Sequence, residues 1–181
     1  MSDKPTYLGL LNAIAVAERR GYAVLCAWRD ATADAELAET LNMVAIRENE
    51  HAAAFTKRLC ELGYSLRERA NPDYEARLAV AAAPGGDADK FRSVLGYGSA
   101  SQDDPLARLF DDRSIDPQTG ALLGRFIAEE RDSERRLRAQ WARIDRQPAR
   151  PAAADDPLLA DIADRIERLS RTIEELKRLR R

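Results

Sequence analysis

The sequence predicts an all-α protein, and both its apolar periodicity and its composition support this fold class. Over long stretches, apolar residues recur at steps of three, four or seven, the spacing that turns one face of an α-helix toward a core. No stretch alternates apolar and polar residues with the period of two that is typical of a half-buried strand. Alanine, leucine, glutamate and arginine, all good helix formers, dominate the composition. The 181 residues suffice for one domain with a core and an appendage.

The first two predicted helices span about residues 6–30 and 34–62 and form an αα-hairpin, because only a short turn separates them. Asp34 suits the N-cap of the second helix, and Gly63 tolerates the positive φ at which many helices end. An acidic residue interrupts the apolar stripe of each helix. The stripes are Leu11, Ala15, Glu18, Tyr22 and Leu25 on the first helix, and Leu37, Leu41, Val44, Glu48, His51, Phe55 and Leu59 on the second.

The third long helix is the least regular of the predicted elements. A long connection with a short helix over residues 73–82 precedes it, which is typical of a crossover along a bundle. The helix itself is expected over residues 88–110, with Asp87 as its N-cap. It is broken by three residues that disfavour helix, Gly96, Gly98 and Pro105.

The fourth long helix is predicted over residues 117–145, since Asp116 is a good N-cap and Pro117 suits the first helical position. Its apolar stripe also contains an acid. The stripe is Leu123, Phe126 or Ile127, Glu130, Ser133 or Glu134, Leu137, Trp141 and Ile144. An internal repeat with an offset of 82 positions relates this helix to the second one, matching Glu130 to Glu48 and Ser133 to His51.

Beyond this predicted bundle domain, residues 1–145, the composition changes. Residues 146–157 are rich in proline and alanine and are expected to form a semi-extended linker. Residues 158–181 follow a heptad pattern with isoleucine at a and leucine at d, which favours a parallel two-stranded coiled coil and hence a homo-oligomer. The pattern covers only about three heptads, which is a marginal length for a coiled coil. The alternative is that this helix packs against the bundle of its own chain.

The acids on the buried stripes point to a metal site. Glu48 and His51, the only histidine, lie one turn apart on the second helix, and Glu18 and Glu130 lie on the stripes of two others. Burying several carboxylates without a cation is strongly unfavourable, and Glu-x-x-His on a bundle helix offers an oxygen and a nitrogen to one ion. The alternative is a metal-free core pair in which Glu18 accepts a hydrogen bond from His51.

The pair Glu18 and Glu48, thirty residues apart on a hairpin and followed by His51, resembles the half-site of the ferritin-like superfamily, in particular rubrerythrin-type domains and two-helix encapsulated ferritins. The resemblance implies a four-helix bundle that holds two iron or other transition ions and oxidises ferrous iron or reduces oxygen or peroxide. Glu130 matches the acid of the second Glu-x-x-His. Ser133 stands where its histidine belongs, the third-helix glutamate is missing, and Glu134 is a weaker candidate ligand on the adjacent face.

Three interpretations follow from these departures. In the first, the bundle binds one ion, or an asymmetric pair, of iron or manganese through Glu18, Glu48, His51 and Glu130. In the second, the hairpins of two subunits build one di-iron site between them. In the third, the site is a relic, and the protein is a metal-free scaffold that assembles through its coiled coil.

Charge and hydropathy bear on the other function classes. The formal net charge of -2 gives no electrostatic reason to expect a nucleic-acid partner. No apolar run approaches the roughly 20 residues of a membrane span, and the first residues show no signal-peptide pattern, so a cytoplasmic protein is expected.

Overall fold

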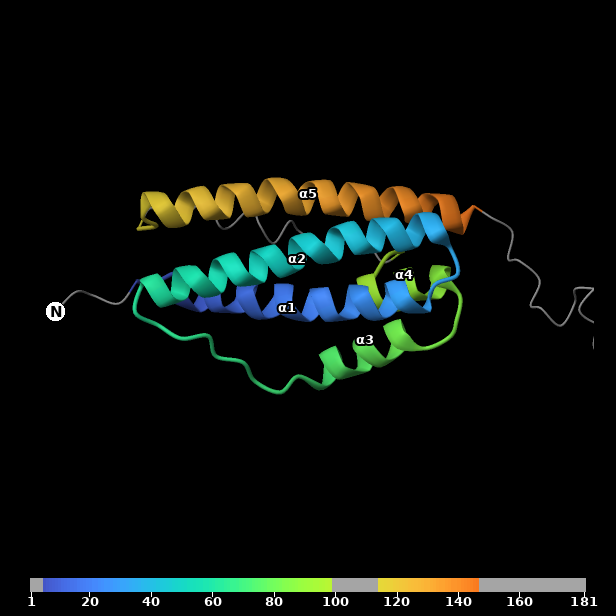
Figure 1. The fold of residues 1–181 in the computed structure, drawn as a ribbon, viewed down its shortest axis with the longest axis horizontal. Helices are drawn as coiled ribbons and strands as arrows, with labels where there is room; N and C mark the ends of the chain where they lie inside the picture. Colours follow the sequence, from blue (N-terminus) through green and yellow to red (C-terminus); the bar gives the residue numbers. More distant parts are fainter. Residues whose placement is uncertain (1–4, 99–113, 147–181) are drawn as a thin grey trace, which may run out of the picture. The chain divides into compact units, whose positions relative to one another are not determined.

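The computed structural model describes residues 5–98 and 114–146, and within these ranges every regular element is an α-helix. The helices are α1 (Leu8–Ala31), α2 (Ala35–Glu61), α3 (Pro72–Ala82), α4 (Asp87–Leu95) and α5 (Pro117–Asp145), as Figure 1 shows. The predicted all-α class is thereby confirmed. No described helix is long and apolar enough to cross a membrane.

The chain divides into two compact units, residues 1–145 and 146–181. All five helices belong to the first unit. The linker and the heptad seam predicted for residues 146–181 lie outside the described residues, apart from Arg146.

Helices α1 and α2 form the predicted hairpin, and local side-chain chemistry sets its turn. The carboxylate of Asp34 accepts a hydrogen bond from the backbone N–H of Leu37 at 3.0 Å, so Asp34 is the N-cap of α2. Arg143 of α5 pairs with the same carboxylate at 2.8 Å. At the other end, α2 is followed by Gly63 with φ +82°, as expected for a helix that ends in a left-handed residue.

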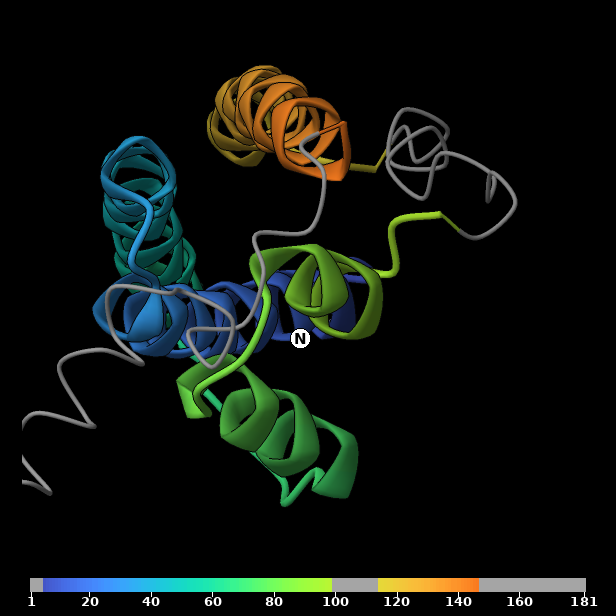
Figure 2. The same ribbon diagram turned by 90° about the vertical axis from the view of Figure 1, so that its right-hand side faces the viewer.

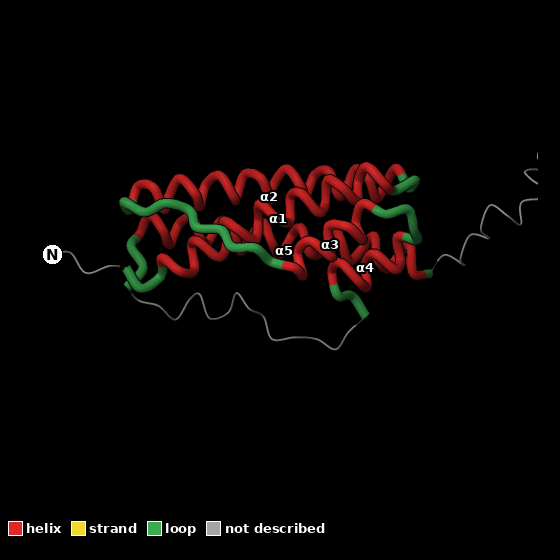
Figure 3. The backbone as a smooth tube through the Cα atoms, turned by 90° about the horizontal axis from the view of Figure 1, so that it is seen from below, coloured by secondary structure: helices red, strands yellow, loops and turns green. Residues whose placement is uncertain are grey.

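The connection after α2 returns along α1 before α3 begins, as Figure 3 shows. The side-chain amide of Asn12 donates to the carbonyl of Arg67 at 2.9 Å and accepts from its backbone N–H at 2.7 Å, which fixes this connection to α1. Asn71 then caps α3 by accepting a hydrogen bond from the N–H of Tyr74. The predicted short helix is therefore present and packs against α1, as can be followed in Figure 2.

Helix α4 covers only the first part of the predicted third long helix. It ends at Leu95 because Gly96 adopts φ +73°, and the next residues do not continue the helix. The remainder of the predicted span, to residue 110, lies mostly in residues 99–113, outside the described residues. Asp87 does not cap α4 as predicted. Its carboxylate instead accepts hydrogen bonds from Trp28 Nε1 at 2.7 Å and Thr32 Oγ1 at 2.8 Å, both on the hairpin.

Asp116 joins the start of α5 to two other parts of the protein. Its Oδ1 accepts the backbone N–H of Thr119 at 3.0 Å, so it caps α5 as predicted. Its two oxygens also accept from Tyr7 Oη at 2.6 Å and Arg58 Nη2 at 2.9 Å. Hydrogen bonds from Thr119 and Tyr7 hold the pKa of Asp116 well below its usual range.

We expect Asp116→Ala to lower the free energy of unfolding by about 2 kcal/mol, because it removes both a helix cap and the partner of Tyr7 and Arg58. Urea denaturation at pH 7 measures this loss. Asp116→Asn is the matched variant, since its side-chain oxygen still caps the helix, and it should lose about half as much. Equal stabilities of all three proteins would contradict this role.

The apolar core lies in two clusters with a polar layer between them. One cluster surrounds Trp28, Leu41 and Phe91, and the other surrounds Leu11, Phe55 and Phe126. Along α1, α2 and α5, the residues between the clusters include the acids and the histidine that the sequence singles out. The exception to the predicted stripes is Tyr22, which is 38% exposed.

Candidate metal centre

Three long helices each bring one predicted ligand to the polar layer. Glu18 lies in the middle of α1, His51 in the second half of α2, and Glu130 in the middle of α5. One donor atom of each residue lies within 4.8 Å of the other two. Glu18 and His51 are almost fully buried, with 6% and 3% exposure, and Glu130 is half-buried. The side chains therefore converge on one point between the two apolar clusters.

The two ring nitrogens of His51 face different carboxylates. Nδ1 lies 3.0 Å from Glu18 Oε2 and 3.5 Å from Glu130 Oε1, while Nε2 lies 2.7 Å from Glu129 Oε2. Burial alone lowers the pKa of His51, but its contacts with Glu130, Glu18 and Glu129 outweigh burial and raise the pKa to about 10. Without a bound cation, the ring is therefore an imidazolium at neutral pH, and both N–H groups donate to carboxylates.

Glu48, the fourth predicted ligand, lies beside Glu18 rather than in the group of three. A Cβ on Gly21 of α1 would overlap the Glu48 carboxyl, so the glycine permits the close approach of this side chain. Burial, then the charges of Glu18 and Glu130, raise the pKa of Glu48 to about 9. Glu48 is thus protonated at neutral pH and donates a hydrogen bond to Glu18, whose own pKa is raised mainly by burial.

The carboxylate of Glu130 is incompletely satisfied. Its Oε1 is buried and accepts no hydrogen bond within the described residues. A buried acceptor without a partner costs free energy, more so when it is charged. Among the described residues, its only close cation is the ring of His51, which already donates from Nδ1 to Glu18. This oxygen can accept a further ligand without giving up a hydrogen bond.

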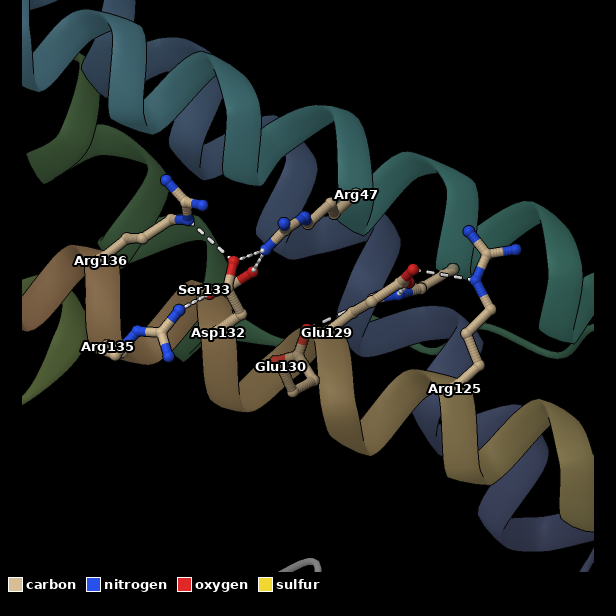
Figure 4. A network of polar contacts seen from close by, with 9 residues as sticks. Arg47, Arg125, Glu129, Glu130, Asp132, Ser133, Arg135 and Arg136 are labelled. Carbon is tan, nitrogen blue, oxygen red and sulfur yellow. Dashed lines mark hydrogen bonds and ion pairs between the residues drawn. The ribbon is translucent and has the colours of Figure 1, made fainter.

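Glu129 is the residue that the sequence-based reasoning missed. Its Oε2 accepts a hydrogen bond from Nε2 of His51. Its Oε1 accepts one from Nε of Arg125 at 2.9 Å (Figure 4). Burial would raise the pKa of Glu129, but these two hydrogen bonds lower it, so Glu129 carries a negative charge. A signal existed in the sequence, because Glu129 lies three residues after Phe126 and four before Ser133, both on the buried face.

An arginine stands next to the position where the sequence repeat places a second histidine. Arg47 Nη1 donates to Ser133 Oγ at 3.2 Å and to Asp132 Oδ2 at 2.8 Å (Figure 4). Arg135 and Arg136 pair with the same aspartate. The guanidinium of Arg47 therefore lies beside Ser133, which is one turn along α5 from Glu130.

Glu134, the weaker candidate, is engaged elsewhere. Its carboxylate accepts a hydrogen bond from Tyr97 Oη at 2.6 Å and pairs with Arg138, and it does not join the group of donors around His51. Hence the structure brings Glu18, His51 and Glu130 together, sets Glu48 and Glu129 beside them, and directs Glu134 to another contact.

A cavity of about 340 Å³ between α2 and α5 reaches the histidine from outside. Glu50 and Arg125 contribute to its polar side, and the ring of Phe126, edge-on to His51 at 5.1 Å between centroids, to its apolar side. A small solute entering this cavity would meet the imidazole before any other group of the cluster.

Neither a family model, nor a curated protein, nor a solved structure matches this chain.

Proposed function

We propose that this protein binds one divalent transition-metal ion through Glu18, His51 and Glu130, as a ferritin-like metal-binding protein. The observation that carries the proposal is the convergence of three donors from three helices on a buried point, where no described residue donates a hydrogen bond to Glu130 Oε1. Two carboxylates and one imidazole form a donor set suited to iron or manganese. A cation there would neutralise charge that the described residues leave uncompensated.

The two sides of the His51 ring support a role as ligand. Nδ1 is the nitrogen beside Glu18 and Glu130, so it is the atom that would face an ion. Nε2–H donates to Glu129, and a carboxylate on the far nitrogen commonly orients a metal-binding histidine and raises its basicity. Glu48 would add a further carboxyl next to Glu18 once it loses its proton.

One ion agrees better with this cluster than the pair implied by the ferritin-like resemblance. A second ion would lie near Ser133, where Arg47 already donates to Ser133 and Asp132. Repulsion from this guanidinium, together with a serine in place of a histidine, disfavours a second cation at that position. The four-helix bundle that the resemblance implies is part of the same proposal, with α1, α2 and α5 as three of its long helices.

Iron is the metal we propose first, and manganese second, because the same oxygen and nitrogen donors accept both. Bound iron supplies one-electron redox chemistry with oxygen or peroxide. The protein would contribute a buried layer that excludes bulk water, the cavity beside His51 as an entry route, and Glu48 as a group that holds a proton next to Glu18.

The second candidate is a metal-free bundle that serves as a scaffold. It is favoured by one observation: His51 already pairs with Glu18 and Glu129 through its two nitrogens, so much of the cluster is satisfied without an ion. The two candidates differ in what happens when metal is offered.

Metal loading distinguishes them. We expect the chelator-treated protein to bind about one ferrous or manganous ion per chain under anaerobic conditions, measured by elemental analysis after gel filtration. Glu130→Gln and His51→Ala should each weaken binding by at least about tenfold, since loss of a ligand or its partner typically costs 10–100-fold. Oxygen added to the ferrous protein should then form ferric iron faster than in buffer.

Glu134→Gln is the matched control, because it removes a carboxylate one turn away on the same helix without touching the cluster. It should bind like the wild type. Absence of binding by the wild type, or equal losses in Glu130→Gln and Glu134→Gln, would refute the site and leave the scaffold. A di-metal site shared by two subunits also holds one ion per chain, so one ion per chain found only in the dimer would indicate such a shared site.

A further inference from the structure

A groove of about 810 Å³ runs along α1. The connection of residues 64–71 and helix α3 contribute to its lining, as do Val94 and Leu95 of α4 and Leu137 of α5. Its lining residues on α1 extend from Leu8 to Leu25, about 25 Å along the helix. The volume falls in the range of roughly 300–1,000 Å³ that is usual for small-molecule sites.

The floor of the groove is apolar and open because of residue size. Gly9, Ala13, Ala17 and Gly21 recur at every fourth position of α1 and line the groove together with Val16. Gly9, Ala13 and Ala17 are exposed to solvent. These four positions carry no side chain larger than a methyl group, so an extended apolar chain could lie against the helix backbone along them, beside the polar groups of Asn12, Arg20 and Glu48 that also line the groove.

One rim of the groove is strongly basic. Arg67 and Arg69 on the connection and Arg77 on α3 line it, and the side chains of all three lack a hydrogen bond or ion pair with any described residue. Arg20 also lines the groove, but Glu68 neutralises it at 3.0 Å. Unpaired guanidinium groups present several donors in a plane, the arrangement that binds the two oxygens of a carboxylate.

From this combination we infer that the groove binds an amphipathic anion of the fatty-carboxylate class, with its head at Arg67, Arg69 and Arg77 and its chain along α1. The apolar floor alone would also accept a helix of another copy of the protein. The three unpaired guanidinium groups favour an anionic head over a second copy, because they leave positive charge that the ligand would neutralise. This ligand site is separate from the group of Glu18, His51 and Glu130, although Glu48, which lies beside Glu18, contributes to its lining.

Calorimetry with dodecanoate, below its micelle concentration, tests the inference on the full chain at pH 7. We expect saturable binding of one dodecanoate per chain. Dodecanol, which has the same chain without the charge, should bind at least tenfold more weakly, and acetate, which has the charge without the chain, should not bind.

Two substitutions separate the head from the chain. Arg77→Gln should weaken dodecanoate binding about tenfold and leave folding unchanged, since the guanidinium has no partner among the described residues. Ala13→Phe fills the floor from an exposed helical position and should abolish binding while the circular dichroism spectrum stays the same. Arg19→Gln is the control, since Arg19 is an exposed arginine of α1 outside the groove lining.

Three outcomes would overturn the inference. Dodecanol binding as tightly as dodecanoate would show that the arginines do not select charge. Unchanged binding in Ala13→Phe would place the ligand elsewhere. A native mass of a dimer that Ala13→Phe converts to a monomer would show that the groove is an interface between two copies.

Discussion

His51→Ala is expected to lower the free energy of unfolding of the metal-free protein by about 3–5 kcal/mol, the usual cost of removing one partner from a buried ionic cluster. The imidazolium is the cation shared by Glu18, Glu129 and Glu130, at 3.0, 2.7 and 3.5 Å. Without it, Glu18 is left buried beside another carboxyl with no positive charge near it. Urea denaturation of chelator-treated protein at pH 7 measures the loss.

A double-mutant cycle with Glu18→Ala identifies the origin of this loss. Each single variant leaves buried charge without its partner, whereas the double variant removes the most deeply buried pair of the cluster. The two losses should therefore fail to add, with a coupling of at least about 1 kcal/mol. Glu50→Ala, next to His51 but exposed, should change stability by less than about 0.5 kcal/mol. Additive losses in the cycle would mean that His51 stabilises only by filling space.

Several helix ends could be predicted because their signals are short-range. Asp34, Gly63 and Asp116 act on backbone groups within a few residues, so their chemistry is readable without knowledge of the fold. Asp87 shows the limit of that reasoning. Its sequence context suits an N-cap, but its carboxylate instead accepts hydrogen bonds from Trp28 and Thr32, which are far away in sequence.

The candidate metal centre could be predicted in part, because periodicity places a residue on a helix face but does not fix the direction of its side chain. The stripe of α5 led to Glu130, and its neighbour Glu129 turned out to face the same histidine from the other side. Tyr22 had the right spacing for the core and is exposed, since the face of α1 that it occupies lacks a covering helix among the described elements. The missed Glu129 and the exposed Tyr22 both depend on how the helices pack against one another. The spacing of residues along one helix does not contain that information.

The stability of the metal-free protein should fall as pH rises from about 6 to about 9, opposite to its metal affinity. The pKa of Glu48 is about 9 in the folded protein against an ordinary 4.5, and that of His51 is about 10 against 6.5. Across this range the folded state therefore binds more protons than the unfolded state, and each rise in pH favours unfolding. We expect a loss of at least about 2 kcal/mol, which corresponds to a melting temperature lower by at least about 4 °C.

The proposed metal binding should have the opposite pH dependence, because an ion would compete with the proton on His51 Nδ1 and with the proton that Glu48 shares with Glu18. Affinity for manganous ion should thus rise between pH 6 and pH 8, with protons released on binding. Glu48→Gln is the matched variant: its amide can still donate to Glu18 but does not titrate, so the melting temperature of the metal-free variant should depend less on pH. Melting curves of the wild type and Glu48→Gln between pH 6 and pH 9, with and without manganese, test the expected rise in metal affinity and the weaker pH dependence of the variant. A metal-free protein that gains stability from pH 6 to pH 9 would show that the cluster does not hold these protons.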